Sequence, residues 1–214
     1  MRSPMSVNMC TLNREMTQAA DAPTARIPNP RGEGERLRVD LVLAARHLLT
    51  EAPEAAPFSL RAVAKRVGVA PSAVYRHFAS VDELVHAVLV DGNAELREAL
   101  ELPDGPLDRR QLIALGHRYL HWGLANPGAY GVLFESADRL AHIAGPGAPG
   151  WDMIEQLTRG LEASHGADAP VVAIRLWTSL HGLTSLRVHK GDDPWPTSAE
   201  HEIEVLVDAL LLTR

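Results

Sequence analysis

The stretch "LRAVAKRVGVAPSAVYRHF", residues 60–78, decides how this chain folds. Its first eight residues have the spacing of a short helix, which Gly68 ends because glycine adopts a left-handed backbone at little cost. Pro71 then opens a second short helix, since proline suits a first helical turn. Ala64 allows the two helices to cross closely, and the predicted inward apolar positions are Val63, Val67, Val69 and Val74. These features predict a helix-turn-helix, whose second helix enters the DNA major groove.

The charge of this stretch differs from that of the rest of the chain. The whole chain is acidic, with a net charge of −6, and residues 91–214 hold ten basic against eighteen acidic side chains. Residues 59–78, in contrast, contain no aspartate or glutamate, and their cationic side chains are Arg61, Lys65, Arg66 and Arg76. A local cationic patch suits a polyanion such as DNA. A solvated helix face would have the same composition, so charge alone does not decide the function.

Helical periodicity covers most of the remaining chain. Residues 36–51 predict a helix before the motif, and a capping box of Ser80 with Glu83 predicts a longer helix after it. Further amphipathic segments predict helices over 107–126, 127–136, 150–165, 170–190 and 198–213. The last begins with a second capping box, of Thr197 with Glu200. No segment alternates like a strand, so we expect an all-α fold of about nine helices.

Composition limits the class of protein further. Residues 1–32 contain four prolines and no persistent apolar period, which predicts a disordered tail. The single cysteine, Cys10, excludes an internal disulfide and fits a reducing cytoplasm. No apolar run approaches the roughly 20 residues of a membrane span. We therefore expect a cytoplasmic protein that has no membrane partner.

The segment "FSLRAVAKRVGVAPSAVYRHFASVDELVHAVL", residues 58–89, resembles the tetracycline-repressor (TetR) family. The Tyr-Arg-His-Phe ending and the capped helix after it carry this resemblance. In addition, "LWTSLHGLTSL" at 176–186 resembles the Trp-His-Gly segment of one branch of TetR-like C-terminal domains. The resemblance implies a dimer in which a three-helix module, residues 33–84, binds DNA. A C-terminal helical bundle, residues 85–214, would then bind a small effector and form the dimer.

The resemblance also implies roles for single residues. Arg61 matches a position that reaches a base edge, where the arginine fork fits guanine O6 and N7. Tyr75 and His77 match positions that hydrogen-bond phosphates, whereas Arg76 and the first turn of the second helix lie toward the bases. The residues expected to contact DNA are Arg61, Pro71, Ser72, Ala73, Tyr75, Arg76 and His77.

The chain departs from the family pattern at two positions. Ala70 stands where many members have a serine or threonine that caps the recognition helix, and the loss of such a cap costs about 1 kcal/mol. Val81 stands where many members have a lysine that meets a phosphate, so we expect slightly less salt-dependent binding.

Candidate effector residues lie in the C-terminal half. A small-molecule pocket needs apolar and aromatic walls with a few polar anchors. The candidates are His117, His121, Trp122, Tyr130, Phe134, Trp151, Trp177 and His181, each of which serves equally well as an ordinary core residue. His117 and His121 also have a spacing that can bind zinc. Because Arg118 replaces the glutamate of a zinc protease, we predict neither a metal nor another cofactor.

We therefore expect a ligand-responsive transcriptional regulator and not an enzyme. As a repressor, it would bind a palindromic double-stranded DNA operator as a homodimer and be released by a small apolar effector. A non-inducible architectural DNA-binding protein is one alternative, and a metal-dependent enzyme using His117 and His121 is another. The apolar stripes predicted to form the dimer seam contain Ile174, Leu180, Leu183, Ile203, Leu206 and Leu210.

Overall fold

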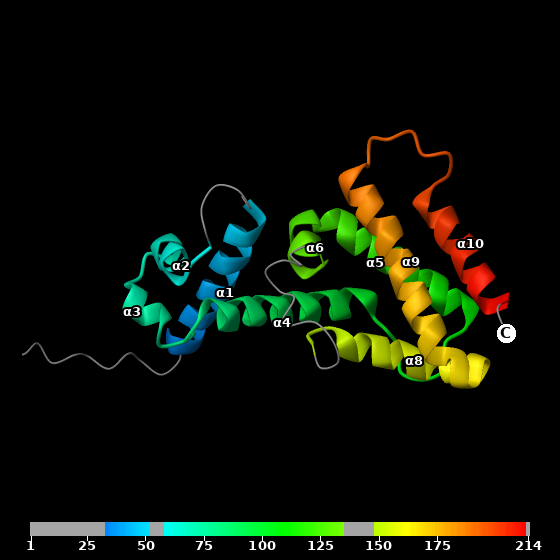
Figure 1. Ribbon diagram of the computed structural model, residues 1–214, viewed down its shortest axis with the longest axis horizontal. Helices are drawn as coiled ribbons and strands as arrows, with labels where there is room; N and C mark the ends of the chain where they lie inside the picture. Colours follow the sequence, from blue (N-terminus) through cyan, green and yellow to red (C-terminus); the bar gives the residue numbers. More distant parts are fainter. Residues whose placement is uncertain (1–32, 52–57, 135–147, 213–214) are drawn as a thin grey trace, which may run out of the picture. The chain divides into compact units, whose positions relative to one another are not determined.

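A computed structural model describes residues 33–51, 58–134 and 148–212 of the chain (Figure 1). These residues form nine α-helices, one short 3-10 helix at Gly166–Asp168 and no strand, so the predicted all-α fold is confirmed. The helices are α1 (Glu33–Glu51), α2 (Leu60–Val67), α3 (Pro71–Val74), α4 (Val81–Leu100), α5 (Arg109–Ala125), α6 (Pro127–Phe134), α8 (Trp151–His165), α9 (Ala169–His189) and α10 (Ala199–Leu212). The tail predicted over residues 1–32 lies outside the described residues. None of the described helices is both long and apolar enough to cross a membrane.

Residues of α1 to α4 pack into a first hydrophobic core. Val63, Val74 and Phe78 are completely buried in it, whereas Val67 and Val69 are only partly buried. Val132 of α6 also enters this core, although α5 separates α6 from α4 in the sequence. The helix-turn-helix is therefore packed on α1 and α4 and is closed in part by α6.

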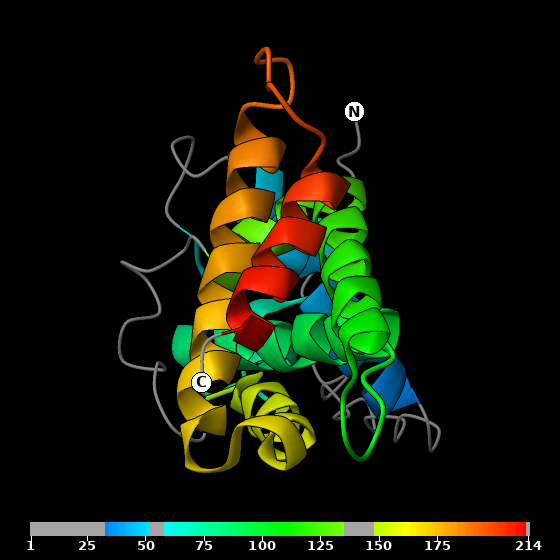
Figure 2. The same ribbon diagram turned by 90° about the vertical axis from the view of Figure 1, so that its right-hand side faces the viewer.

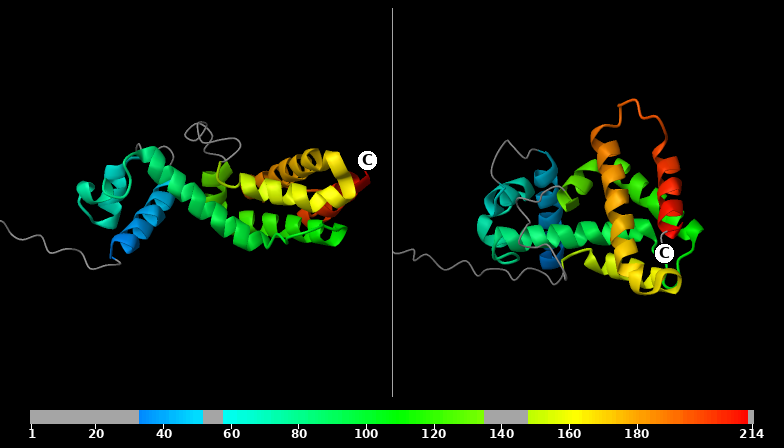
Figure 3. Two further views of the ribbon diagram at one scale, coloured as in Figure 1. Left: turned by 90° about the horizontal axis from the view of Figure 1, so that it is seen from below. Right: turned by 45° about the vertical axis from the view of Figure 1, so that its right-hand side comes forward.

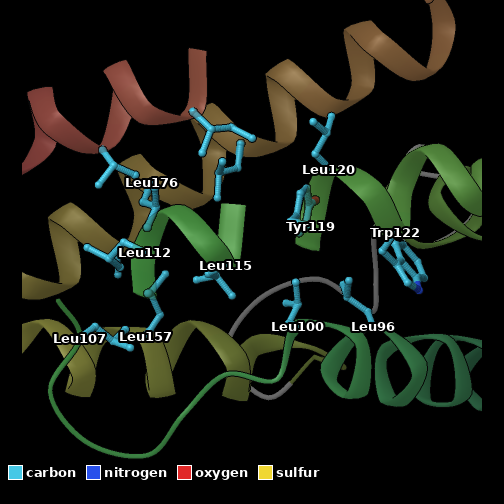
Figure 4. Close-up of a cluster of buried hydrophobic side chains, with 14 of the residues drawn as sticks. Leu96, Leu100, Leu107, Leu112, Leu115, Tyr119, Leu120, Trp122, Leu157 and Leu176 are labelled. Atoms are coloured by element: carbon cyan, nitrogen blue, oxygen red, sulfur yellow. The ribbon is translucent and has the colours of Figure 1, made fainter. Parts of the chain in front are cut away.

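A second hydrophobic core fills the space among the later helices, and Figure 4 shows part of it. The helices α5, α9 and α10 run side by side (Figure 2). Two glycines of α5 permit this packing: a Cβ on Gly116 would lie 2.6 Å from Cγ2 of Ile203, and one on Gly123 would lie 2.5 Å from Cγ2 of Thr184. Because these glycines are seven residues apart, one face of α5 contacts both C-terminal helices.

Helix α4 contributes to both cores and is fixed at several points. Its N-cap is Ser80, as predicted, and the Ser80 hydroxyl accepts a hydrogen bond from the backbone N–H of Glu83 at 3.1 Å. The Glu83 carboxylate accepts from the N–H of Ala79, one residue before the expected partner. Near the other end, Arg97 forms an ion pair with Asp152 of α8. Helix α8 lies alongside the second half of α4 (Figures 1 and 3). These bonds hold α4 at its first turn and in its second half.

The capping box predicted for α10 is wrong. The helix begins at Ala199, so its N-cap is Ser198, whose hydroxyl accepts from the N–H of His201 at 3.1 Å. The Thr197 hydroxyl instead donates to the carboxylate of Glu202. The physical reason is a helix start one residue later than the sequence pattern suggested, which moves both capping positions.

Candidate DNA-binding and effector sites

The turn between α2 and α3 is built by local hydrogen bonds. The hydroxyl of Ser59 caps α2 by accepting from the N–H of Ala62 at 3.2 Å. At the other end, Gly68 has a φ of 78° and donates its N–H to the carbonyl of Ala64 at 2.9 Å. A side chain at this φ would be strained, which explains the glycine. The turn therefore directs the chain from α2 into α3 at a fixed angle.

Helix α3 has a single regular turn and no side-chain cap. Ala70 precedes it in an extended conformation, and Pro71 occupies its first turn. The chain continues as tight turns after Val74, whose carbonyl accepts from the N–H groups of His77 at 2.9 Å and of Phe78 at 3.0 Å. The N–H groups at the start of α3 thus donate no hydrogen bond to an N-cap side chain, as the sequence implied.

The residues predicted to contact DNA lie together on α2, α3 and the turns after α3. Tyr75 is 54% exposed, so it is not a core residue. Lys65 extends the same cationic surface along α2. The other predicted contacts are either exposed (Arg61, Pro71, Ser72 and Arg76) or partly buried (Ala73 and His77). The surface presents arginine and lysine side chains, hydroxyls and a histidine, with no acid between residues 59 and 78.

Five aromatic side chains from α5, α6 and α9 form a cluster, which we call the aromatic cluster: Tyr119, Tyr130, Phe134, Trp177 and His181. The rings of Tyr130 and His181 stack on each other with centroids 5.5 Å apart, and the ring of Phe134 lies 4.9 Å from the first and 5.1 Å from the second. Trp177 stacks on His181 at 5.9 Å. Four of these five residues were effector candidates in the sequence, and three helices bring them together.

Hydrogen bonds within the aromatic cluster converge on His181. The Tyr130 hydroxyl lies 2.7 Å from His181 Nδ1 and donates to the His181 carbonyl at 3.0 Å. The Tyr119 hydroxyl lies 3.3 Å from the same nitrogen. Burial raises the pKa of Tyr119, which keeps this phenol protonated and able to donate. The cluster therefore combines apolar ring faces with polar groups that hydrogen-bond one another.

Tyr119 is a member of the cluster that sequence analysis missed. The signal was present, because Leu112, Leu115, Tyr119 and Trp122 follow the i, i+3, i+4 spacing of a buried helix face. All four side chains are buried, and Trp122 belongs to the second core.

Two of the candidate histidines lie on another face of α5. His121 is mainly exposed, and its Nε2 lies 3.5 Å from a carboxylate oxygen of Glu200. His117 is partly buried, and its Nε2 is enclosed without a hydrogen-bond partner in the described structure. Their ring centroids are 6.4 Å apart. Across residues 33–51, 58–134 and 148–212, no three histidine, cysteine, aspartate or glutamate side chains are grouped so as to hold a metal.

Trp151 lines two open hollows along α8 and is not in the aromatic cluster. The first, of about 460 Å³, lies between α4 and the start of α8 and is lined by Val90, Asn93, Arg97 and Trp151 among others. The second, of about 380 Å³, lies between α8 and the start of α9 and is lined by Trp151, Ile154, Pro170 and Ile174 among others. Neither hollow is lined by Tyr119, Tyr130 or His181.

Two family models match the chain, and together they span more than half of it. Residues 41–88 match "Bacterial regulatory proteins, tetR family", and residues 112–210 match "Tetracyclin repressor-like, C-terminal domain". The chain therefore belongs to the TetR family of bacterial regulatory proteins. Members of this family bind DNA and small-molecule effectors, usually act as dimers, and are regulators and not enzymes.

Individual relatives agree with this assignment. The HTH-type transcriptional regulator Rv1816 of Mycobacterium tuberculosis is 32% identical over 120 residues, which are 53% of this chain and 50% of that protein. The chain thus spans about half the length of the curated relatives it matches. A transcriptional regulator from Rhodococcus sp. Rha1 has a TM-score of 0.65 at 23% identity, covering 81% of this chain and 95% of its own. The multidrug binding protein EbrR, solved with imidazole, has a TM-score of 0.60 at 22% identity, covering 83% and 96%. These two structures establish the likeness of fold.

Proposed function

We propose that this regulator is a repressor that binds a palindromic operator as a homodimer and leaves it when a small, mainly apolar effector binds. The observation that carries the proposal is the acid-free cationic surface of α2 and α3 in a chain that also holds the aromatic cluster. The first suits a duplex, and the second suits an organic ligand.

In this proposal, the side chains of the helix-turn-helix divide between bases and phosphates. Arg61 and Arg76 read base edges, because the arginine fork donates two parallel hydrogen bonds to guanine. Pro71, Ser72 and Ala73 lie against the groove, where their small size allows close approach. Tyr75 and His77 donate hydrogen bonds to phosphates and so fix the orientation of the module. Such phosphate contacts carry no sequence information by themselves.

The proposed effector site centres on the aromatic cluster. Tyr130, Phe134 and Trp177 supply apolar ring faces, and His181 with the Tyr119 hydroxyl supplies hydrogen bonds that orient a phenol, ketone or amide. A multiply charged effector is disfavoured, because a buried charge without a partner is costly. His121 and Trp151 lie outside this set, and we assign them no part in the effector site.

Helix α6 provides a route from the effector to the DNA-binding module. It carries Tyr130 in the aromatic cluster and Val132 in the first core. Its Leu133 packs so closely on α4 that a Cβ on Gly92 would lie 3.1 Å from Leu133 Cδ2. A ligand that moves Tyr130 therefore shifts both contacts of α6. To reduce operator affinity 100-fold, the effector must favour the released conformation by about 2.7 kcal/mol.

The proposed dimer uses the outer faces of α9 and α10. Leu180 and Ile203, which were predicted for the seam, are buried within the chain's own second core. Leu183, Leu206 and Leu210 are partly buried against that core, and Ile174 lines the hollow beside α8. The apolar residues exposed for a partner are Val171 and Leu186 on α9 and Val205 and Leu212 on α10. Gly182 has open space around it, which permits close approach of a second helix.

Leu186→Glu is expected to weaken dimerisation at least about tenfold, because two buried glutamates would face each other across the symmetry axis. Sedimentation velocity over a range of concentrations measures this change. The matched control is Leu124→Glu on α5, since Leu124 is 45% exposed and Leu186 is 44% exposed. A Leu186→Glu chain that dimerises like the wild type would place the seam elsewhere.

The proposed function is tested by selecting genomic DNA fragments with the purified chain and then screening for release. We expect an inverted repeat among the selected fragments, lower expression of a reporter placed behind it, and release by apolar compounds but not by sugar phosphates. Binding without sequence preference would support the architectural alternative. Release by metal ions alone would reject the apolar effector and support a role for His117 and His121.

A further inference from the structure

Arg38 of α1 lies against the end of the recognition segment. Its guanidinium carbon is 5.1 Å from the centroid of the Phe78 ring, which places the planar cation over the ring face. Arginine stacks well on aromatic rings because its charge is delocalised and weakly hydrated. Phe78 is completely buried and anchored in the first core, so its ring provides a fixed platform. The position of the Arg38 head group is therefore set by the fold.

The platform is next to residues already assigned to the DNA interface. Phe78 directly follows His77, and both donate their backbone N–H to the carbonyl of Val74. The Arg38 guanidinium is thus held at the C-terminal end of the segment that begins with α3. Base contacts of a recognition helix come mainly from its N-terminal residues, and the flanking positions meet the backbone. The location of Arg38 consequently suits a phosphate better than a base.

The charge of Arg38 is not neutralised within the part of the chain that the structure describes. The side chain is exposed, and it forms no ion pair with a described acidic residue. Some arginines of the chain are neutralised in this way, for example Arg97 by Asp152 and Arg109 by Asp208, but Arg38 is not neutralised by any described residue. An unneutralised cation held on an aromatic ring is prepared to bind an anion with little loss of side-chain freedom.

We propose that Arg38 is a further phosphate-binding residue of the DNA interface, positioned by the ring of Phe78. The proposal rests on the proposed function, because it requires that α2 and α3 face the duplex. It extends the interface from the helix-turn-helix onto α1.

The test compares Arg38→Met with the wild type on two duplexes, one selected by the chain from random sequence and one of scrambled sequence. Methionine keeps an apolar cover on Phe78 but removes the charge. We expect affinity for both duplexes to fall by the same factor, about tenfold for a dimer that loses two contacts. The slope of log K against log salt, measured from about 50 to about 200 mM KCl, should become shallower by about 0.9 per arginine lost.

Three further variants make the result specific. Arg38→Gln removes the same charge with a polar side chain and should reduce the slope equally. Arg38→Lys keeps the charge and should leave the slope near that of the wild type, with slightly weaker binding because lysine stacks less well. Arg36→Gln is the matched control, since Arg36 is also exposed on α1 but lies two residues away, on a different side of the helix. It should behave like the wild type.

Several outcomes would overturn the proposal. An unchanged slope in both Arg38→Met and Arg38→Gln would leave Arg38 as a cover for Phe78 only. A loss confined to the selected duplex would make Arg38 a base-reading residue. If Arg36→Gln lost as much DNA affinity as the Arg38 variants, the effect would come from the general positive charge of α1 and not from a specific site. If instead the wild type binds neither duplex, the proposed function itself fails.

Discussion

Tyr130→Ala is expected to lower the free energy of unfolding by about 3–5 kcal/mol, the range typical of a large aromatic side chain removed from a core. Tyr130 is completely buried and contacts the rings of Tyr119, Phe134 and His181. Its loss would open a cavity where α5, α6 and α9 meet. It would also remove the hydroxyl group that hydrogen-bonds His181. Urea unfolding at constant pH, followed by circular dichroism, measures the change.

Two variants separate the parts of this effect. Tyr130→Phe keeps the ring but removes the hydrogen bonds to His181, which should cost about 1–2 kcal/mol. Tyr75→Ala removes an exposed tyrosine and should change the free energy of unfolding by no more than about 0.5 kcal/mol. Equal losses for alanine at positions 130 and 75 would show that the aromatic cluster does not hold the bundle together.

Arg61→Ala and Arg76→Ala are each expected to reduce discrimination between operator and random DNA by about 1–3 kcal/mol. Both side chains are exposed, so the variants should remain folded. The double variant should lose about a hundredfold or more in the ratio of the two affinities, provided that the arginines read separate base pairs. Gel shifts at a single salt concentration, with the selected operator and with random DNA, give this ratio.

A control arginine distinguishes base reading from general charge. Arg110→Ala, at the exposed start of α5, removes one charge away from the helix-turn-helix and should leave the ratio unchanged. If Arg61→Ala and Arg76→Ala also keep the wild-type ratio but bind both DNAs more weakly, the two arginines bind phosphates. The assignment to base edges would then be wrong.

Sequence analysis predicted the helix-turn-helix well because its determinants are local. The glycine conformation at Gly68, the proline at the start of α3 and the missing cap at Ala70 depend on neighbours within a few residues. The N-cap at Ser80 is local in the same sense. For these elements, backbone preference and short-range hydrogen bonds agree with the hydrophobic pattern, so the fold follows from the chain itself.

The aromatic cluster was harder to predict, because its geometry depends on which helices meet. His117, His121 and Trp151 have suitable chemistry, but the packing of α5 on α10 and of α8 on α9 places them away from the aromatic cluster. Tyr119 was missed although it follows the buried stripe of α5. The apolar stripe with Leu180 and Ile203 faces the chain's own core, since periodicity identifies an apolar face but not its partner.

The placement of α6 has a consequence for how this chain can be altered by recombination. Since Val132 fills part of the first core, residues 33–84 do not carry all of their own interior. A chimaera that joins them to the C-terminal half of another regulator would leave a void, or a clash, unless the incoming helix had a side chain of matching shape. The DNA-binding module and the C-terminal half are thus not freely exchangeable parts of this chain. Divergence of either half is constrained by a helix that both halves need.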